Sequence, residues 1–132
     1  AGHYYFRDFY YSDSGLLASV LVLNIVSKMK IEGVKFSQAI DEISTYANTG
    51  EVNFIINNKQ EAMDTVLKYF KDNNADYKFF DFDGYRLEFK NWWFNIRPSN
   101  TEPYLRFLAE AESEELLESK TNIIYDILSK YE

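Results

Sequence analysis

Two arginines flank a short polar loop in the segment RPSNTEPYLR, residues 97–106. An arginine presents paired N–H groups that match two oxygens of a phosphate. The residues between the arginines add hydroxyl and amide groups and backbone N–H donors, which can cluster into an anion-binding concavity. Two prolines stiffen the loop and reduce the entropy lost when it is ordered around a ligand. The pattern predicts a phosphate site formed by Arg97, Ser99, Asn100, Thr101 and Arg106.

The same loop has a plainer interpretation. Ser, Asn and Thr are common in turns, and the two arginines can be surface ion-pair partners of nearby glutamates such as Glu102. From the residue pattern alone, the two interpretations stand about equal.

The charge of the chain restricts what the loop can bind. The sequence has 132 residues, enough for one ordinary domain, and 14 basic against 21 acidic residues give a net charge of −7. Such a surface repels nucleic acid and anionic lipid, so we expect neither as a partner. An anion site must therefore be local and shaped. No apolar run reaches the 18 or so residues of a membrane-spanning helix, and the absence of cysteine excludes disulfides.

The elements that must position the loop follow from hydrophobic periodicity. From residue 50 the pattern predicts a strand (51–57), a helix, three or four strands (77–111) and a final helix capped by Ser113. Asp83-Gly84 between apolar runs predicts a hairpin; DFDG also resembles part of a calcium loop, but the remaining ligands are absent. The order predicts an α+β fold, a mostly antiparallel sheet of four to five strands with two helices on one face.

The N-terminal third has a different character. The sequence of residues 14–29 predicts a helix that is apolar on nearly every side. Such a helix is normally buried on every side. A linker and a short helix follow in residues 31–49. The linker is long enough for this helix to pack on its own domain or to reach a second copy. Of the two, we expect self-association through residues 16–29.

The loop sequence carries a family resemblance. RPSNTEP, followed by a strand that contains Arg106, resembles the phosphate-binding loop of the α-D-phosphohexomutases, and more narrowly that of the bacterial phosphomannomutase/phosphoglucomutase branch. Asn100 fits that branch better than the glucosamine branch, where glycine is usual. GHYYF (2–6) resembles the end of the family's sugar-binding motif Glu-x-Ser-Gly-His, and GEVNF (50–54) resembles the opening of the fourth, TATA-binding-protein-like domain.

The resemblance implies a domain organisation and a set of site residues. Residues 1–30 would be the helical remnant of the third, α/β, sugar-binding domain, 31–49 a linker, and 50–132 the fourth, phosphate-binding domain. His3 would contact the sugar, and the five loop residues would contact the substrate phosphate. The motif's glutamate is missing and Ala1 stands at its serine position, which puts the sugar-binding role of His3 in doubt.

The resemblance also implies a reaction. The parent enzyme would interconvert hexose 1-phosphate and hexose 6-phosphate (mannose or glucose) in the cytoplasm through a phosphoserine, Mg²⁺ and a hexose 1,6-bisphosphate. The phosphoserine and magnesium loops are absent here. We therefore expect a C-terminal piece of a four-domain enzyme that is inactive alone, holds no catalytic residue, binds no metal or cofactor itself, and works with upstream domains of the same polypeptide on a phosphosugar. Two alternatives remain: a stand-alone module for another phosphorylated ligand, and a non-catalytic structural interaction domain.

Overall fold

The chain forms two compact units, Ala1–Thr45 and Tyr46–Glu132, in a computed structural model that describes residues 2–74 and 76–132. The first unit opens with a two-stranded hairpin that the sequence pattern did not predict. Its strands are too short to show an alternating pattern. The elements of this unit are β1 (Tyr5–Phe6), a 3₁₀ turn (Arg7–Phe9), β2 (Ser12–Asp13), α1 (Gly15–Ile31) and α2 (Phe36–Ile43).

Helix α1 confirms the helix predicted for residues 14–29. The hydroxyl of Ser14 accepts a hydrogen bond from the N–H of Leu17 (3.1 Å) and caps the helix. None of its residues is buried, and Leu16 and Leu23 leave 79% and 64% of their surface exposed. In the described residues no helix combines the length and the apolar character needed to cross a bilayer.

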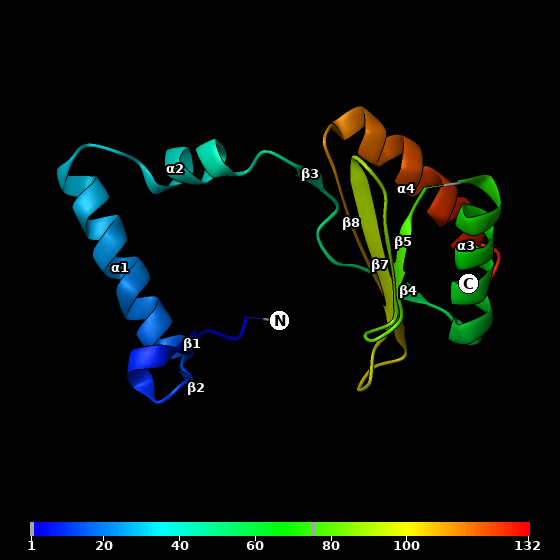
Figure 1. Cartoon of the computed structure of the whole chain (residues 1–132), viewed down its shortest axis with the longest axis horizontal. Coiled ribbons are helices and arrows are strands. Elements are labelled where there is room, and N and C mark those ends of the chain that lie inside the picture. Colours follow the sequence, from blue (N-terminus) through cyan, green and yellow to red (C-terminus); the bar gives the residue numbers. More distant parts are fainter. Residues whose placement is uncertain (1, 75) are drawn as a thin grey trace. The chain divides into compact units, whose positions relative to one another are not determined.

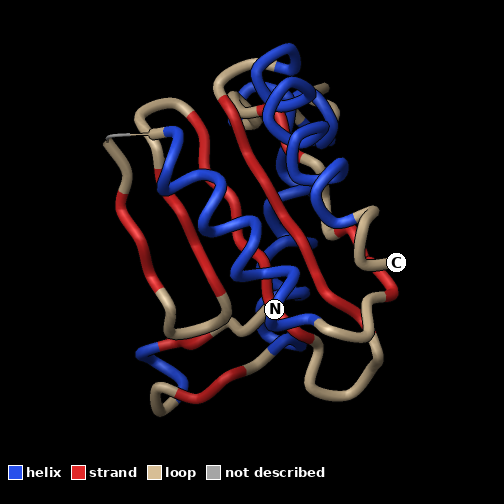
Figure 2. Tube along the Cα trace, turned by 90° about the vertical axis from the view of Figure 1, so that its right-hand side faces the viewer, coloured by secondary structure: helices blue, strands red, loops and turns tan. Residues whose placement is uncertain are grey.

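The second unit is an antiparallel sheet with two helices on one face (Figures 1 and 2). Its elements are β3 (Ala47–Asn48), β4 (Val52–Ile55), α3 (Lys59–Asn73), β5 (Lys78–Phe80), β6 (Tyr85–Glu88), β7 (Trp92–Pro98), β8 (Tyr104–Ala111) and α4 (Glu114–Leu128). The strand order is β3-β8-β7-β6-β5. β3 and β4 pair with the same edge of β8, β3 at its C-terminal end and β4 at its N-terminal end.

The predicted α+β fold is confirmed, with one correction to the strand count. The sheet has six strands instead of four to five, because Ala47–Asn48 forms a strand inside the segment assigned to the linker. Two residues cannot show a period, and only pairing with Ala111 and Glu110 of β8 makes them a strand.

Alternation along β7 and β8 separates a core face from an open face. The side chains that face α3 and α4 are buried. The ring centroid of Phe70, from α3, lies 5.2 Å from that of Phe94 and 5.3 Å from that of Trp92. The intervening residues are half-buried and face away from the helices, because side chains alternate along a strand. The open face of β7 and β8 carries Trp93, Asn95, Arg97, Arg106, Leu108 and Glu110.

The cap of α4 gives a prediction for stability. The hydroxyl of Ser113 accepts a hydrogen bond from the N–H of Leu116 (3.2 Å). Replacing Ser113 with alanine leaves that N–H unpaired and should lower the free energy of unfolding by about 1 kcal/mol in urea denaturation. Ser119→Ala, at an exposed position within the same helix, is the matched control and should not destabilise the protein. Equal effects of the two substitutions would contradict the capping role.

Candidate anion-binding site

The loop between β7 and β8 brings the two arginines together. Arg97 and Arg106 are directly opposite each other in the strand register, so both side chains leave the same open face. Opposed residues in an antiparallel pair have Cβ atoms about 4.5–5.5 Å apart. The N–H of Ser99 donates to the carbonyl of Tyr104 (2.9 Å) and closes the base of the loop.

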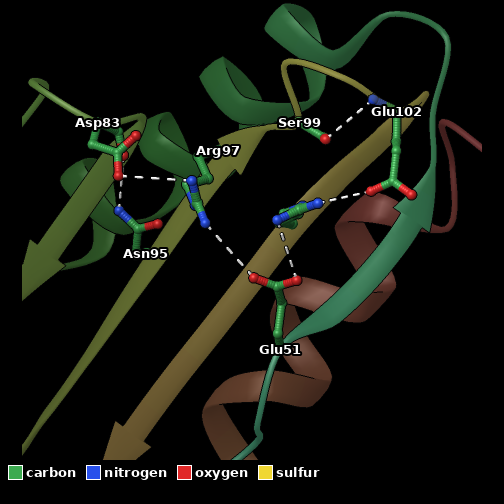
Figure 3. Close-up of polar contacts among 7 residues, drawn as sticks. Glu51, Asp83, Asn95, Arg97, Ser99 and Glu102 are labelled. Atoms are coloured by element: carbon green, nitrogen blue, oxygen red, sulfur yellow. Dashed lines mark hydrogen bonds and ion pairs between the residues drawn. The ribbon is translucent and has the colours of Figure 1, made fainter. Parts of the chain in front are cut away.

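Three carboxylates surround the arginine pair (Figure 3). Glu51 contacts both guanidinium groups. One of its carboxylate oxygens lies 3.7 Å from a nitrogen of Arg97, and the other lies 3.6 Å from a nitrogen of Arg106. Asp83 lies 3.8 Å from Arg97 on its other side. Glu102 accepts a hydrogen bond of 2.8 Å from Arg106. The ion pair with Glu102 in the plainer interpretation is therefore present, and it coexists with the convergence of the two arginines.

Both guanidinium groups remain partly accessible. The side chains of Arg97 and Arg106 are 32% and 26% exposed. Within the described residues, Nε of Arg106 is buried and has no hydrogen-bond partner. Two like charges directly opposite each other on a sheet repel, so the surrounding carboxylates stabilise the pair while no ligand is bound.

The other loop residues lie at the tip of the same hairpin. Ser99 is half-buried, and its hydroxyl accepts a hydrogen bond from the N–H of Glu102 (3.3 Å). Asn100 and Thr101 are exposed, and in the part of the chain that is described their backbone N–H groups donate to no protein atom. All five residues predicted to contact phosphate are therefore gathered at one end of the sheet.

Asn53 and Gly84 lie on either side of the two arginines, beside β8 and β7 respectively. Asn53 of β4 lies opposite Arg106 on the far side of β8, and its side chain is exposed. Gly84, directly before β6, approaches Arg97 so closely that a Cβ atom there would lie 2.4 Å from the Cβ of Arg97. Sequence reasoning missed the contribution of Glu51, Asp83 and Asn53, because only the strand register brings these distant residues to the loop.

His3 belongs to the first unit. Its Nδ1 lies 2.5 Å from one carboxylate oxygen of Asp13, and the other oxygen accepts the N–H of Tyr4 (2.9 Å). The hydrogen bond from His3, followed by that from Tyr4, lowers the pKa of Asp13. The ring of His3 is exposed, and Ala1 lies outside the described residues. A sugar-binding role for His3 stays a prediction.

Neither the hairpin at DFDG nor any other described segment forms a metal site. β5 and β6 pair around residues 81–84, with Phe80 opposite Arg86 and Gly84 at a φ of +74°, so the predicted hairpin is confirmed. In residues 2–74 and 76–132, no group of three His, Asp or Glu side chains is placed to hold a metal ion. The paired guanidinium groups at the β7–β8 end are of the type that binds an oxyanion.

Comparison with known proteins shows which family the chain resembles. The family model described as "Phosphoglucomutase/phosphomannomutase, C-terminal domain" matches residues 51–126. A phosphomannomutase of Methanocaldococcus jannaschii is 36% identical over 131 residues, which is 98% of this chain and 27% of that protein. Phosphohexose mutases of Xanthomonas campestris pv. campestris are 32% identical over 97% of the chain and 28% of their own length.

A solved structure shares the fold. A phosphoglucomutase/phosphomannomutase family protein of Burkholderia thailandensis superimposes with a TM-score of 0.69 at 24% identity, covering 98% of this chain and 27% of that one. The chain spans about a quarter of the length of these relatives. By the match over residues 51–126, the chain belongs to the phosphoglucomutase/phosphomannomutase family, in which those residues correspond to the C-terminal domain.

Proposed function

We propose that this chain is the substrate-phosphate-binding part of a phosphohexomutase, and that Arg97 and Arg106 hold the phosphate of a hexose phosphate. The observation that carries the proposal is the convergence of both guanidinium groups on the two oxygens of one carboxylate, that of Glu51. A phosphate offers the same arrangement of acceptor oxygens with a larger negative charge. Ser99, Asn100 and Thr101 would supply additional donors from the loop.

The proposed reaction explains the use of a separate phosphate site. The complete enzyme would transfer a phosphoryl group between O1 and O6 of mannose or glucose, with a phosphoserine as donor and acceptor and a bisphosphorylated sugar as intermediate. In each half-reaction one phosphate does not react. Binding that phosphate anchors the sugar and supplies free energy for positioning at the distant reacting end. A site that contacts phosphate without contacting the sugar serves both orientations of the substrate.

The remaining requirements of the reaction fall to other residues. Mg²⁺ and the phosphoserine would supply the Lewis acid and the phosphoryl group, and the described residues hold no cluster that fits a metal. We assign these roles, and the cytoplasmic location, to a longer polypeptide of the relatives' length. The contribution of the present chain is to bind the phosphate and, by closing over the substrate, to exclude water that would hydrolyse the phosphoserine.

Titration with inorganic phosphate tests the proposal. We expect chemical-shift changes in the loop with a dissociation constant of about 1 mM or weaker, because a few charge-assisted hydrogen bonds of ~1.5–3 kcal/mol must offset the entropy of binding. Arg97→Ala and Arg106→Ala should abolish the response and leave the fold intact, since both side chains lie on the open face.

Arg86→Ala is the matched control for this titration. Arg86 lies on the same face, but it pairs with Glu88 (2.8 Å) and stacks over the ring of Trp93 (4.0 Å) away from the loop. This variant should bind phosphate as the unchanged chain does. Titration curves of Arg97→Ala and Arg106→Ala that match those of the unchanged chain would rule out the assignment.

A further inference from the structure

The arginine site carries no net positive charge when no ligand is bound. Two guanidinium groups contribute +2, and the carboxylates of Glu51, Asp83 and Glu102 contribute −3. The ammonium group of Lys59, which donates to the backbone carbonyl of Glu102 (3.4 Å), adds +1, so the cluster sums to 0. A phosphate that approaches this arrangement meets no net attraction, and each carboxylate beside the arginines repels it. At least one carboxylate must therefore withdraw before the arginines can hold a phosphate.

The geometry of the contacts indicates which carboxylate withdraws. Glu102 is held by Arg106 through a hydrogen bond of 2.8 Å, and the backbone of Glu102 also bonds to Ser99. Both contacts of Glu51 are 3.6–3.7 Å long, beyond the usual range of a charge-assisted hydrogen bond. Exposed ion pairs of this length contribute little free energy, and the side chain of Glu51 is 46% exposed. Its displacement therefore costs little.

Glu51 also occupies the position that a bound phosphate needs. It lies between the two guanidinium groups, with one carboxylate oxygen toward each (Figure 3). Asp83 and Glu102 each contact a single arginine from its outer side. Two negatively charged groups cannot share the central position, so binding of one requires the departure of the other.

We propose that Glu51 is an internal counter-ion of the arginine pair: it keeps the two guanidinium groups converged while the site is free, and it competes with phosphate for them. The inference rests on the proposed phosphate-binding function. Once Glu51 has moved away, the remaining charges sum to +3 − 2 = +1, and the site attracts an anion. Competition of this kind also favours release, which the proposed reaction requires because the bisphosphorylated intermediate must leave the site to reorient.

Glu51→Gln in the full chain tests this competition. The amide keeps the size of the side chain and removes its charge, so inorganic phosphate should bind about three- to tenfold more tightly at low ionic strength. The gain should shrink in ~1 M NaCl, where the Debye length is about 3 Å. Glu51→Asp keeps the charge and should stay closer to the unchanged chain. Glu118→Gln, on the exposed side of α4, removes the same charge far from the loop and should change nothing.

The possible outcomes separate this inference from the proposed function. Weaker phosphate binding by Glu51→Gln would show that the carboxylate only orders the arginines, and unchanged binding would show that it does not compete; either result overturns the inference. Loss of binding in Arg97→Ala would still support the phosphate site in both cases. If neither the unchanged chain nor Glu51→Gln responds to phosphate, the inference and the proposed function fail together.

Discussion

Replacing Gly84 with alanine should lower the free energy of unfolding of the second unit by about 2–4 kcal/mol. Gly84 has a φ of +74°, in a region that costs about 1 kcal/mol for a residue with a side chain. An added Cβ would also lie 2.4 Å from the carbonyl oxygen of Ile96 and 2.4 Å from the Cβ of Arg97. Relieving such an overlap in a packed sheet costs a further ~1–3 kcal/mol.

Gly50→Ala separates the two contributions. Gly50 has a similar φ of +62°, but a Cβ there would meet no atom within 4 Å. This variant should lose only about 1 kcal/mol. Urea denaturation of both variants measures the difference, and phosphate titration should show weaker binding in Gly84→Ala because β7 must shift at Arg97. Equal losses of stability in the two variants would show that β6 and β7 do not require the close approach.

The sequence pattern predicted the parts of the fold that a local period or turn can reveal. The alternation in YLRFLAEA places a strand at residues 104–111, and β8 covers those residues. Asp83-Gly84 predicted a hairpin, and the turn requires the positive φ that only glycine adopts without strain. The convergence of Arg97 and Arg106 depends only on the hairpin that joins their strands, so it too could be predicted from the sequence.

The features that were missed depend on contacts between distant segments. β3 exists because Ala47 and Asn48 pair with the end of β8, more than 60 residues later. Glu51 reaches the arginines because β4 pairs with the start of the same strand, with Asn53 opposite Arg106. Register of this kind is set by the whole sheet, so a single sequence gives no local signal for it.

The final prediction is that the full chain self-associates and that residues 46–132 alone are monomeric. The apolar side chains of α1 are exposed around the helix, and each Å² of apolar surface left in water costs about 25 cal/mol. Several Leu, Val and Ile side chains therefore cost several kcal/mol, which is comparable to the stability of a small domain. In a polypeptide of the relatives' length other residues can cover this helix. In the 132-residue chain we expect a second copy to cover this helix, and a two-fold dimer is the commonest arrangement.

Sedimentation of four proteins at high micromolar concentration tests this expectation. The full chain should sediment as an oligomer, and residues 46–132 should sediment as a folded monomer, since every member of the hydrophobic core lies between Ile56 and Leu128. Leu23→Lys in the full chain should weaken the association, because it places a charge in the middle of α1. Ile43→Lys, at an exposed apolar position in α2, is the control and should leave the association intact. A full chain that remains monomeric would show that α1 does not mediate self-association, while the phosphate site on the open face of β7 and β8 would be unaffected by that result.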